Sequence, residues 1–440
     1  MDQDISATTR ALAIPHVVEA ICEYLPRSSL CSAAQVDRRF FEYATRCIWG
    51  EDAPRVRSLL WHLQRSVTDP LHRQLYASKL RSLIVDCRRR DTYDWAFRRP
   101  PLALDHLRHL LLLRYEGGAT SAGETGRALL RRHVPPDTIR SLDLSVADAG
   151  LLDGVLGERC GRLRELRLDY PLPADEPALA RFVAACPRLE VVEALMFRRG
   201  RPASLATEPD AAPWSFSIGP EVMVECARLP HLRELMLPFN GEVPSKALGM
   251  MDARVSRPFR SLRKMRVVVP WVIRDDGFGS QGSGRDDQIW ATLTWFSQIR
   301  TLEDVRICVP CDHTVPESAL MSLCSLPALK RLGMVNRHKV HQKDGHAILQ
   351  VSPGQFAAWV SHFPRLERLW LDVRVPPGSY DAALIELGKH CPLLQECQWP
   401  AEVNLSALQL ESREESLFPN LKHLWFPMTG PAPRDDDFPR

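Results

Sequence analysis

Residues 352–371 read SPGQFAAWVSHFPRLERLWL and contain the pattern that decides the fold. The segment 352–363 is apolar on one face and ends just before Pro364. Proline disfavours helical geometry in the residue before it and lacks an amide hydrogen, so a helix ends there. Leu366, Leu369 and Leu371 follow at intervals of three and two, which predicts a short strand. The stretch therefore predicts one unit of helix, turn and strand.

This unit recurs along the chain at intervals of 24 to 43 residues. Helices of about ten residues are predicted at 176–186, 220–229, 316–326, 352–363 and 379–391. Six of twelve apolar triplets have a proline two residues before their first member, where the 35 prolines of the chain would give about one by chance. Such a period predicts a solenoid. The triplets are Leu80-Leu83-Val85, Leu107-Leu110-Leu112, Ile139-Leu142-Leu144, Leu163-Leu166-Leu168, Leu189-Val192-Ala194, Leu232-Leu235-Leu237, Leu262-Met265-Val267, Leu302-Val305-Ile307, Leu329-Leu332-Met334, Leu366-Leu369-Leu371, Leu394-Cys397-Trp399 and Leu421-Leu424-Phe426.

The repeating unit resembles the long, helix-containing leucine-rich repeats of F-box proteins, over roughly residues 75–427. The asparagine that usually ends the strand is missing from most repeats. The resemblance implies an α/β fold, an irregular solenoid with a curved parallel sheet inside and helices outside. Polar segments at 198–213, 274–287 and 336–345 are predicted to be mobile surface insertions.

Residues 11–50 read ALAIPHVVEAICEYLPRSSLCSAAQVDRRFFEYATRCIWG and predict three short helices. Pro15 suits the first turn of a helix, and Pro26 ends that helix. Ser28 or Ser29 is the predicted cap of the second helix and Asp37 that of the third. Forty residues cannot bury this apolar surface alone, so part of it must lie against the repeats or another protein.

The order of these residues resembles a divergent, fungal-like F-box. In that family the motif binds the Skp-type adaptor of a cullin–RING ubiquitin ligase. His16 stands where an acidic residue is usual, and Asp37 replaces a common cysteine. The alternative is a helical cap that shields the first repeat. The resemblance implies adaptor contacts by Ile14, Pro15, Val18, Ile21, Leu25, Leu30, Val36, Arg38, Phe40 and Trp49.

The predicted organisation has five parts. They are a disordered start at 1–10, the F-box-like domain at 11–50, a linker or cap helix at 51–74, the repeats at 75–427 and a disordered tail at 428–440. The 57 basic and 54 acidic residues leave a net charge of +3, which predicts no binding to nucleic acid or anionic membrane. The N-terminus lacks an apolar signal core, and the longest apolar stretches cannot span a bilayer. With only 12 cysteines, these features predict a reducing cytoplasmic or nuclear location.

No motif predicts a catalytic centre or a cofactor. A glycine-rich phosphate loop and a Gly-x-Ser-x-Gly elbow are both missing. Cys308, Cys311 and His313 lie close in sequence, but no second pair of zinc ligands is near, so no metal site is expected. Cys308 is predicted to follow a strand and to pack against it. The histidines of one polar segment are expected to be solvated rather than metal-binding; they are His338, His341 and His346.

Side chains alternate between the two faces of a strand, so the residue between the second and third triplet members faces away from the core. The residue after the third member shares that face. This predicts exposed tryptophans on the concave side of the solenoid, and Trp and Arg are common interface anchors. The alternatives are a tail folded over the tryptophans or a register shifted by one residue. We expect target binding by Arg167, Arg266, Arg306, Trp370, Asp372 and Trp425.

These features together predict a substrate receptor without catalytic residues of its own. It would hold a target protein near the catalytic partners of an SCF-type ligase. A second hypothesis is a repeat scaffold without any link to ubiquitination. A third is an enzyme with one reactive cysteine, although Cys186 and Cys391 precede prolines at predicted helix ends and are expected to be buried.

Overall fold

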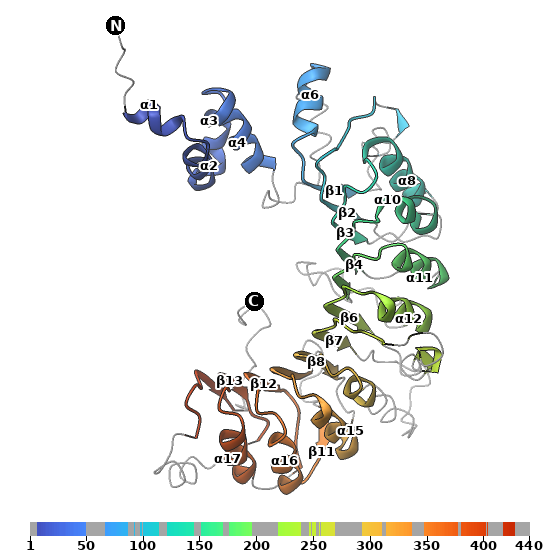
Figure 1. Ribbon diagram of the computed structural model, residues 1–440, viewed down its shortest axis with the longest axis vertical. Helices are drawn as coiled ribbons and strands as arrows, with labels where there is room; N and C mark the ends of the chain where they lie inside the picture. Colours follow the sequence, from blue (N-terminus) through green and yellow to red (C-terminus); the bar gives the residue numbers. More distant parts are fainter. Residues whose placement is uncertain are drawn as a thin grey trace, which may run out of the picture. The chain divides into compact units, whose positions relative to one another are not determined.

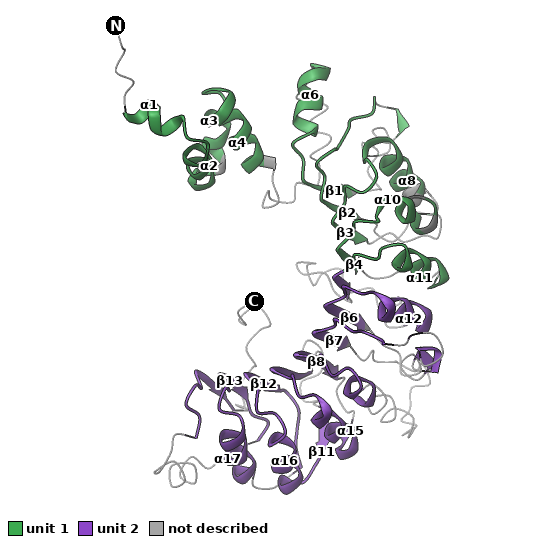
Figure 2. Ribbon diagram, in the orientation of Figure 1, with its two compact units in different colours: residues 1–189 green, residues 190–440 purple. Residues whose placement is uncertain are grey.

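The computed structural model describes residues 7–49, 67–86, 92, 97–98, 100–113, 121–144, 151–169, 176–195, 219–238, 246–247, 249–251, 255, 257–268, 293–309, 314–336, 347–376, 380–401, 403 and 417–426. The chain divides into two compact units, residues 1–189 and residues 190–440 (Figure 2). None of the described helices has the length and apolarity that a bilayer crossing requires.

Unit 1 begins with a group of helices, residues 7–49, which we call the N-terminal helical unit (Figure 1). Its helices are α1 (Ala7–Leu12), α2 (Pro15–Tyr24), α3 (Arg27–Ala33) and α4 (Arg38–Trp49). They pack around a small shared core. The core consists of Val18, Cys22, Leu30, Ala33 and Ala44.

The ends of these helices follow the sequence predictions with two exceptions. Pro15 occupies the first turn of α2 as predicted, and the Asp37 carboxylate caps α4 by accepting bonds from the Arg39 and Phe40 amides at 2.8 and 2.9 Å. The predicted serine cap of α3 is wrong, because the helix starts directly after Pro26 and both serines lie inside its first turn. Residues 7–10, expected to be disordered, belong to α1.

The rest of unit 1 alternates helices with parallel strands. Its strands pair in the order β1-β2-β3-β4. α6 crosses the predicted boundary at residue 75, and residues 51–66 of the linker or cap helix predicted at 51–74 lie outside the described residues. The elements are α6 (Pro70–Ala77), β1 (Ser82–Asp86), β2 (His109–Leu113), α8 (Ser121–His133), β3 (Ser141–Leu144), a π-helical turn (Leu152–Leu156) with α10 (Gly157–Arg159), β4 (Glu165–Asp169) and α11 (Glu176–Ala184).

Unit 2 continues the alternation with eight parallel strands in the order β5-β6-β7-β8-β10-β12-β13-β14. Two further short strands, β9 and β11, pair in parallel with each other. The elements are β5 (Val191–Leu195), α12 (Pro220–Arg228), β6 (Glu234–Pro238), β7 (Lys264–Val268), β8 (Asp304–Val309), β9 (Thr314–Pro316), α15 (Glu317–Ser322), a 3₁₀ turn (Leu323–Ser325), β10 (Arg331–Asn336), β11 (Ile348–Gln350), α16 (Pro353–Val360), β12 (Arg368–Leu371), α17 (Asp381–His390), β13 (Glu396–Gln398) and β14 (His423–Trp425).

The apolar triplets form the core of both units. Every member of the first eleven triplets is buried, whereas Leu421, Leu424 and Phe426 of the last are half-buried. The strand predicted for each triplet is present, and its buried residues confirm the predicted register. The five predicted helices are also present, as α11, α12, α15, α16 and α17. The helices line one face of the strands in each unit (Figure 1), so the predicted α/β fold class with a parallel sheet and outer helices is confirmed.

Buried aromatic side chains fill the space between α16, α17 and β13. Phe356 contacts Trp359 at 5.3 Å, Trp399 at 5.2 Å and Tyr380 at 5.8 Å between ring centres. The Tyr380 hydroxyl donates to the Val351 carbonyl at 3.0 Å. Aromatic side chains bury large areas, so this cluster fixes the helices behind the strands that carry the site described below.

Several predictions fall outside the described residues. They are the insertions at 198–213 and 274–287, the insertion at 336–345 apart from Asn336, and the tail at 428–440. The start of the chain at 1–6 does so as well.

Candidate functional site

The face of the sheet opposite the helices, which we call the open face, carries side chains in rows. The rows arise because neighbouring strands pair in register. Each strand contributes one residue to a first row and the residue two positions later to a second row. The triplets predicted the second row but not the first. In unit 2 the first row runs from Val191 to His423, and the Asp, Glu, Lys and Arg residues between them are Glu234, Lys264, Asp304, Arg331, Arg368 and Glu396. The second row is Glu193, Met236, Arg266, Arg306, Gly333, Trp370, Gln398 and Trp425.

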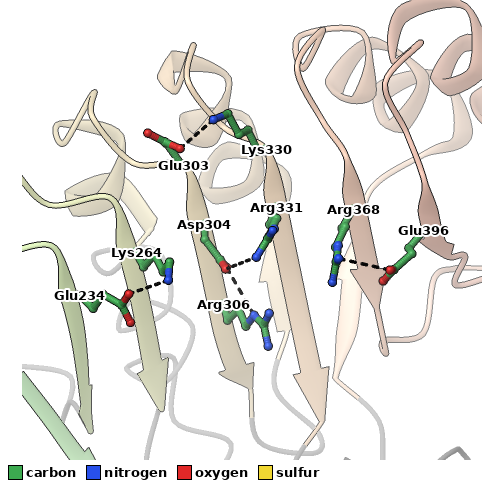
Figure 3. Close-up of polar contacts among 9 residues, drawn as sticks. All are labelled: Glu234, Lys264, Glu303, Asp304, Arg306, Lys330, Arg331, Arg368 and Glu396. Carbon is green, nitrogen blue, oxygen red and sulfur yellow. Dashed lines mark hydrogen bonds and ion pairs between the residues drawn. The ribbon is translucent and has the colours of Figure 1, made fainter. Parts of the chain in front are cut away.

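Charged side chains of the first row pair across adjacent strands (Figure 3). Lys264 Nζ lies 2.5 Å from Glu234 Oε1, which neutralises that end of the row. The Asp304 carboxylate lies between two arginines. Arg331 Nη1 of β10 is 3.8 Å from Asp304 Oδ2, and Arg306 Nε, on the same strand as Asp304, donates to Asp304 Oδ1 at 3.4 Å.

At the other end of this row, Arg368 of β12 and Glu396 of β13 form a further cross-strand pair at 3.5 Å (Figure 3). Glu303 and Lys330 pair at 2.9 Å just before β8 and β10. These pairs connect consecutive repeats along the open face.

Trp370 is the centre of the second row, and its predicted exposure is wrong. Its side chain is only 6% exposed. The Arg306 guanidinium lies 4.6 Å from the indole centre and that of Arg368 lies 5.9 Å from it, so two cations cover the ring. Arg306 reaches Trp370 past Gly333, which lies between them on β10.

Positive charge is concentrated in the middle of the open face of unit 2. We call Arg266, Arg306, Arg331 and Arg368 the arginine patch. Burial lowers the pKa of Arg306, and the like charges of Arg266 and Arg331 act in the same direction, while Asp304 opposes them. A guanidinium stays charged at neutral pH even so. Within the described part of the chain, the carboxylates that pair with the patch are Asp304 and Glu396, both buried, so these six side chains carry a surplus of two positive charges.

The remaining predicted target-binding residues lie elsewhere. Arg167 lies on β4 of unit 1, where it pairs with Glu165 at 3.3 Å, and so is not part of the patch. Asp372 follows β12 and is half-buried, with its amide donating to the Met334 carbonyl at 2.8 Å. Trp425, also predicted to be exposed, is half-buried on β14 and stacks on His423 at 5.3 Å.

The predicted adaptor-binding residues divide by exposure. Val18 and Leu30 belong to the core of the N-terminal helical unit and are buried in it. Ile21, Leu25 and Phe40 are half-buried, and Leu25 and Phe40 pack against that core. Pro15 and Arg38 are exposed, and the side chain of Trp49 lies outside the description.

Ile14 and Val36 are the exposed large aliphatic members of this set among the described side chains. Ile14 is 50% exposed and Val36 is 66% exposed. Each lies in a turn between helices, and Arg39 Nη1, in the first turn of α4, donates to the Ala13 carbonyl beside Ile14 at 3.0 Å. We call Ile14 and Val36 the exposed apolar pair.

The N-terminal helical unit also contacts α6 and the residues that follow it. The Phe41 ring lies 6.1 Å from that of Tyr76, and Glu42 forms an ion pair with Lys79. Neither contact involves Ile14 or Val36. The exposed apolar pair therefore takes no part in the contacts of α4 with Tyr76 and Lys79.

The residues predicted to be candidates for metal or thiol chemistry lie partly within the described chain. No group of three or more His, Cys, Asp or Glu side chains could hold a metal among these residues. Cys308 lies inside β8 rather than after it, and Cys311 and the four histidines at 313, 338, 341 and 346 are outside the described residues. Cys186 and Cys391 are buried as predicted, and burial raises the pKa of each thiol to about 12.

The parallel strands, outer helices and buried leucine triplets define an α/β protein of the leucine-rich-repeat type. One similar solved structure is the leucine-rich repeat-containing protein LegL7 from Legionella pneumophila, with 14% identity, 72% of this chain and 89% of that chain covered, and a TM-score of 0.33. Another is the complex of Rad7 and Elc1 in yeast, with 14% identity, 96% of this chain and 93% of that chain covered, and a TM-score of 0.35. No protein-family model matches the chain, and no curated protein matches it.

Proposed function

We propose that this chain is a substrate receptor of an SCF-type cullin–RING ubiquitin ligase. In this proposal the N-terminal helical unit binds a Skp-type adaptor and the open face of the repeats binds a target protein. The chain needs no catalytic residue, because it acts by holding the target close to the catalytic subunits. Such a receptor would work in the cytoplasm or the nucleus.

The exposed apolar pair supports the first half of the proposal. A helical cap would bury its apolar side chains on the neighbouring repeat, yet Ile14 and Val36 stay exposed. Tyr24, at the other end of α2, is 91% exposed. Burying apolar area contributes about 25 cal/mol per Å², so a partner that covers these side chains gains binding energy from them.

Co-expression with a Skp-type adaptor tests this half directly. The wild-type chain is expected to elute from size exclusion as a one-to-one complex with the adaptor. The double variant Ile14→Asp/Val36→Asp should weaken binding by about 2 kcal/mol or more, roughly 30-fold in Kd, if the pair is an interface hot spot. Both residues lie outside the core of the unit, so the variant should still fold.

Leu71 offers a matched control. It is an exposed apolar residue of α6, with 81% of its surface accessible, and Leu71→Asp should leave adaptor binding unchanged. Equal binding by the double variant and the control would rule out the proposed surface. A chain that folds alone and never binds the adaptor would favour a repeat scaffold without a ubiquitin ligase.

A further inference from the structure

We propose that the arginine patch binds an acidic peptide segment that lies across β7, β8, β10 and β12. This inference rests on the proposal that the open face binds a target protein, and it specifies the chemistry of that target. The shared chemistry is a short run of oxyanions, which either carboxylate side chains or phosphorylated side chains can supply.

Charge is the first reason. Among the described residues, the four arginines of the patch form ion pairs with two carboxylates, Asp304 and Glu396. Arg266 has no carboxylate within ion-pair distance among the described residues, and it lies beside Arg306 in the register of β7 and β8. Like charges held this close repel each other, so an anion that binds between them relieves the repulsion.

The lengths of the existing pairs are the second reason. They measure 3.4, 3.8 and 3.5 Å, whereas a charge-assisted bond from a guanidinium to a carboxylate is usually about 2.7–2.9 Å long. Each guanidinium carries about five N–H donors in a planar fork. The patch therefore keeps donors that can form shorter, bidentate bonds with the oxyanions of a ligand.

The spacing of the strands sets the length of the segment. Parallel neighbours lie about 4.8 Å apart, so the four strands from β7 to β12 span roughly 14 Å. An extended peptide rises about 3.3 Å per residue, so about four or five residues cover that distance.

Trp370 acts here as a positioning residue. It is too buried to stack on a ligand, but its ring holds the guanidiniums of Arg306 and Arg368 on either side of Gly333. Removing the ring should free these arginines to adopt many conformations and so weaken binding of the acidic segment, without removing any charge.

The test measures binding of three fluorescent ten-residue peptides to the full chain without adaptor. One peptide carries four central glutamates, the second carries four glutamines, and the third carries two phosphoserines. The glutamate or the phosphoserine peptide should bind, the glutamine peptide should not, and binding should fall steeply when salt is raised. Whichever of the two acidic peptides binds more tightly identifies the source of the oxyanions.

Single variants locate the binding. Arg266→Glu should weaken the tighter acidic peptide at least about tenfold, because it reverses a charge that pairs with no other side chain in the described residues. Arg228→Glu, on the outer helix α12, is the matched control and should change little. Trp370→Leu should also weaken binding, and a melting curve shows whether this variant is folded. If Trp370→Leu does not fold, Arg266→Glu is the variant that decides the test.

Three results would overturn the inference. They are equal binding of the glutamine peptide, equal effects of Arg266→Glu and Arg228→Glu, and tighter binding of a single-stranded RNA of the same length than of either acidic peptide. Adaptor binding is measured in a separate experiment with variants of the exposed apolar pair. Failure of the ligase proposal therefore shows as missing adaptor binding, and failure of this inference shows in the peptide measurements.

Discussion

Arg306 and Trp370 show how side chains on nearby strands change each other's exposure. The triplets predict that Arg306 and Trp370 share one face, and they do. They cannot predict that the tryptophan is covered, because that depends on the path of the Arg306 side chain. This side chain crosses β10 past Gly333 and lies on the indole. An exposed aromatic anchor thus becomes a buried support for charged groups.

Alanine substitutions at two helical glycines should change the free energy of unfolding in opposite directions. Alanine normally stabilises a helix by up to about 1 kcal/mol relative to glycine. In α16, a Cβ at Gly354 meets nothing within 4 Å, so Gly354→Ala should stabilise unit 2. In α17, a Cβ at Gly388 would lie 2.9 Å from the Leu417 carbonyl oxygen, so Gly388→Ala should destabilise it by about 1–3 kcal/mol. Urea denaturation measures both, and a stabilising Gly388→Ala would contradict the packing described here.

The buried thiols predict a loss of stability at alkaline pH. Burial raises the pKa of Cys186, Cys226 and Cys391 to about 12, from 9.0 for an accessible thiol. Between these values the unfolded chain loses the thiol proton and the folded chain keeps it. The free energy of unfolding should therefore be unaffected below about pH 9 and fall above it, by about 1.4 kcal/mol per pH unit for each thiol.

Cys186→Ala isolates one of these contributions. The stability difference between wild type and this variant should shrink as pH rises from 9 to 11, because only the wild type carries the titrating thiol. Denaturant unfolding at several pH values measures the difference. A constant difference across this range would show that the thiol is not protected by burial.

At the scale of elements, α4 depends on the residue at its start. Asp37 stands where the resembling family usually has cysteine, and its carboxylate accepts both the Arg39 and Phe40 amides. Asp37→Ala should cost about 1 kcal/mol of stability, whereas Asp37→Asn should cost little, because asparagine caps helices about as well. Thermal unfolding compares the two variants, and equal losses would show that the charge rather than the cap matters.

Strands and helices were predictable from the sequence because their signals are local. Each triplet marks a strand, and a proline such as Pro364 marks the end of the helix before it. The first row of the open face was missed, although a signal was present. The residue directly before the second triplet member is charged in most repeats of unit 2, as Lys264, Asp304 and Arg368 show.

What could not be predicted depends on contacts between repeats. Val18 and Leu30 match an adaptor-binding motif, but the packing of α2, α3 and α4 places them in a core. Ile14 and Val36 match the same motif and lie in turns, where they remain exposed. Helical spacing alone does not distinguish an apolar side chain that faces its own unit from one that faces a partner.

At the scale of the whole molecule, the C-terminal repeat differs from those before it. Its triplet is half-buried, and β14 pairs with β13 on one edge. Deleting residues 403–440 would expose β13 and remove the Leu417 and Phe418 contacts to α17. Because repeats contact mainly their neighbours, the shortened chain should remain folded but unfold at a lower denaturant concentration and aggregate more readily.

Circular dichroism and denaturant unfolding measure that result. A shortened chain with unchanged stability would show that β14 contributes nothing to the fold. Complete loss of structure would show that the repeats fold only as one block and not by addition of neighbours.

Among the described residues of each unit, the strands of the large sheet pair in the order in which the chain forms them, with β9 and β11 in a separate small sheet. A nascent chain leaving the ribosome can therefore fold each repeat before the following repeat has been synthesised. The most recently synthesised repeat would always expose apolar side chains until the next repeat has been synthesised and covers them. Slow translation would prolong this exposure, so chaperone demand during biosynthesis should increase with the length of each pause.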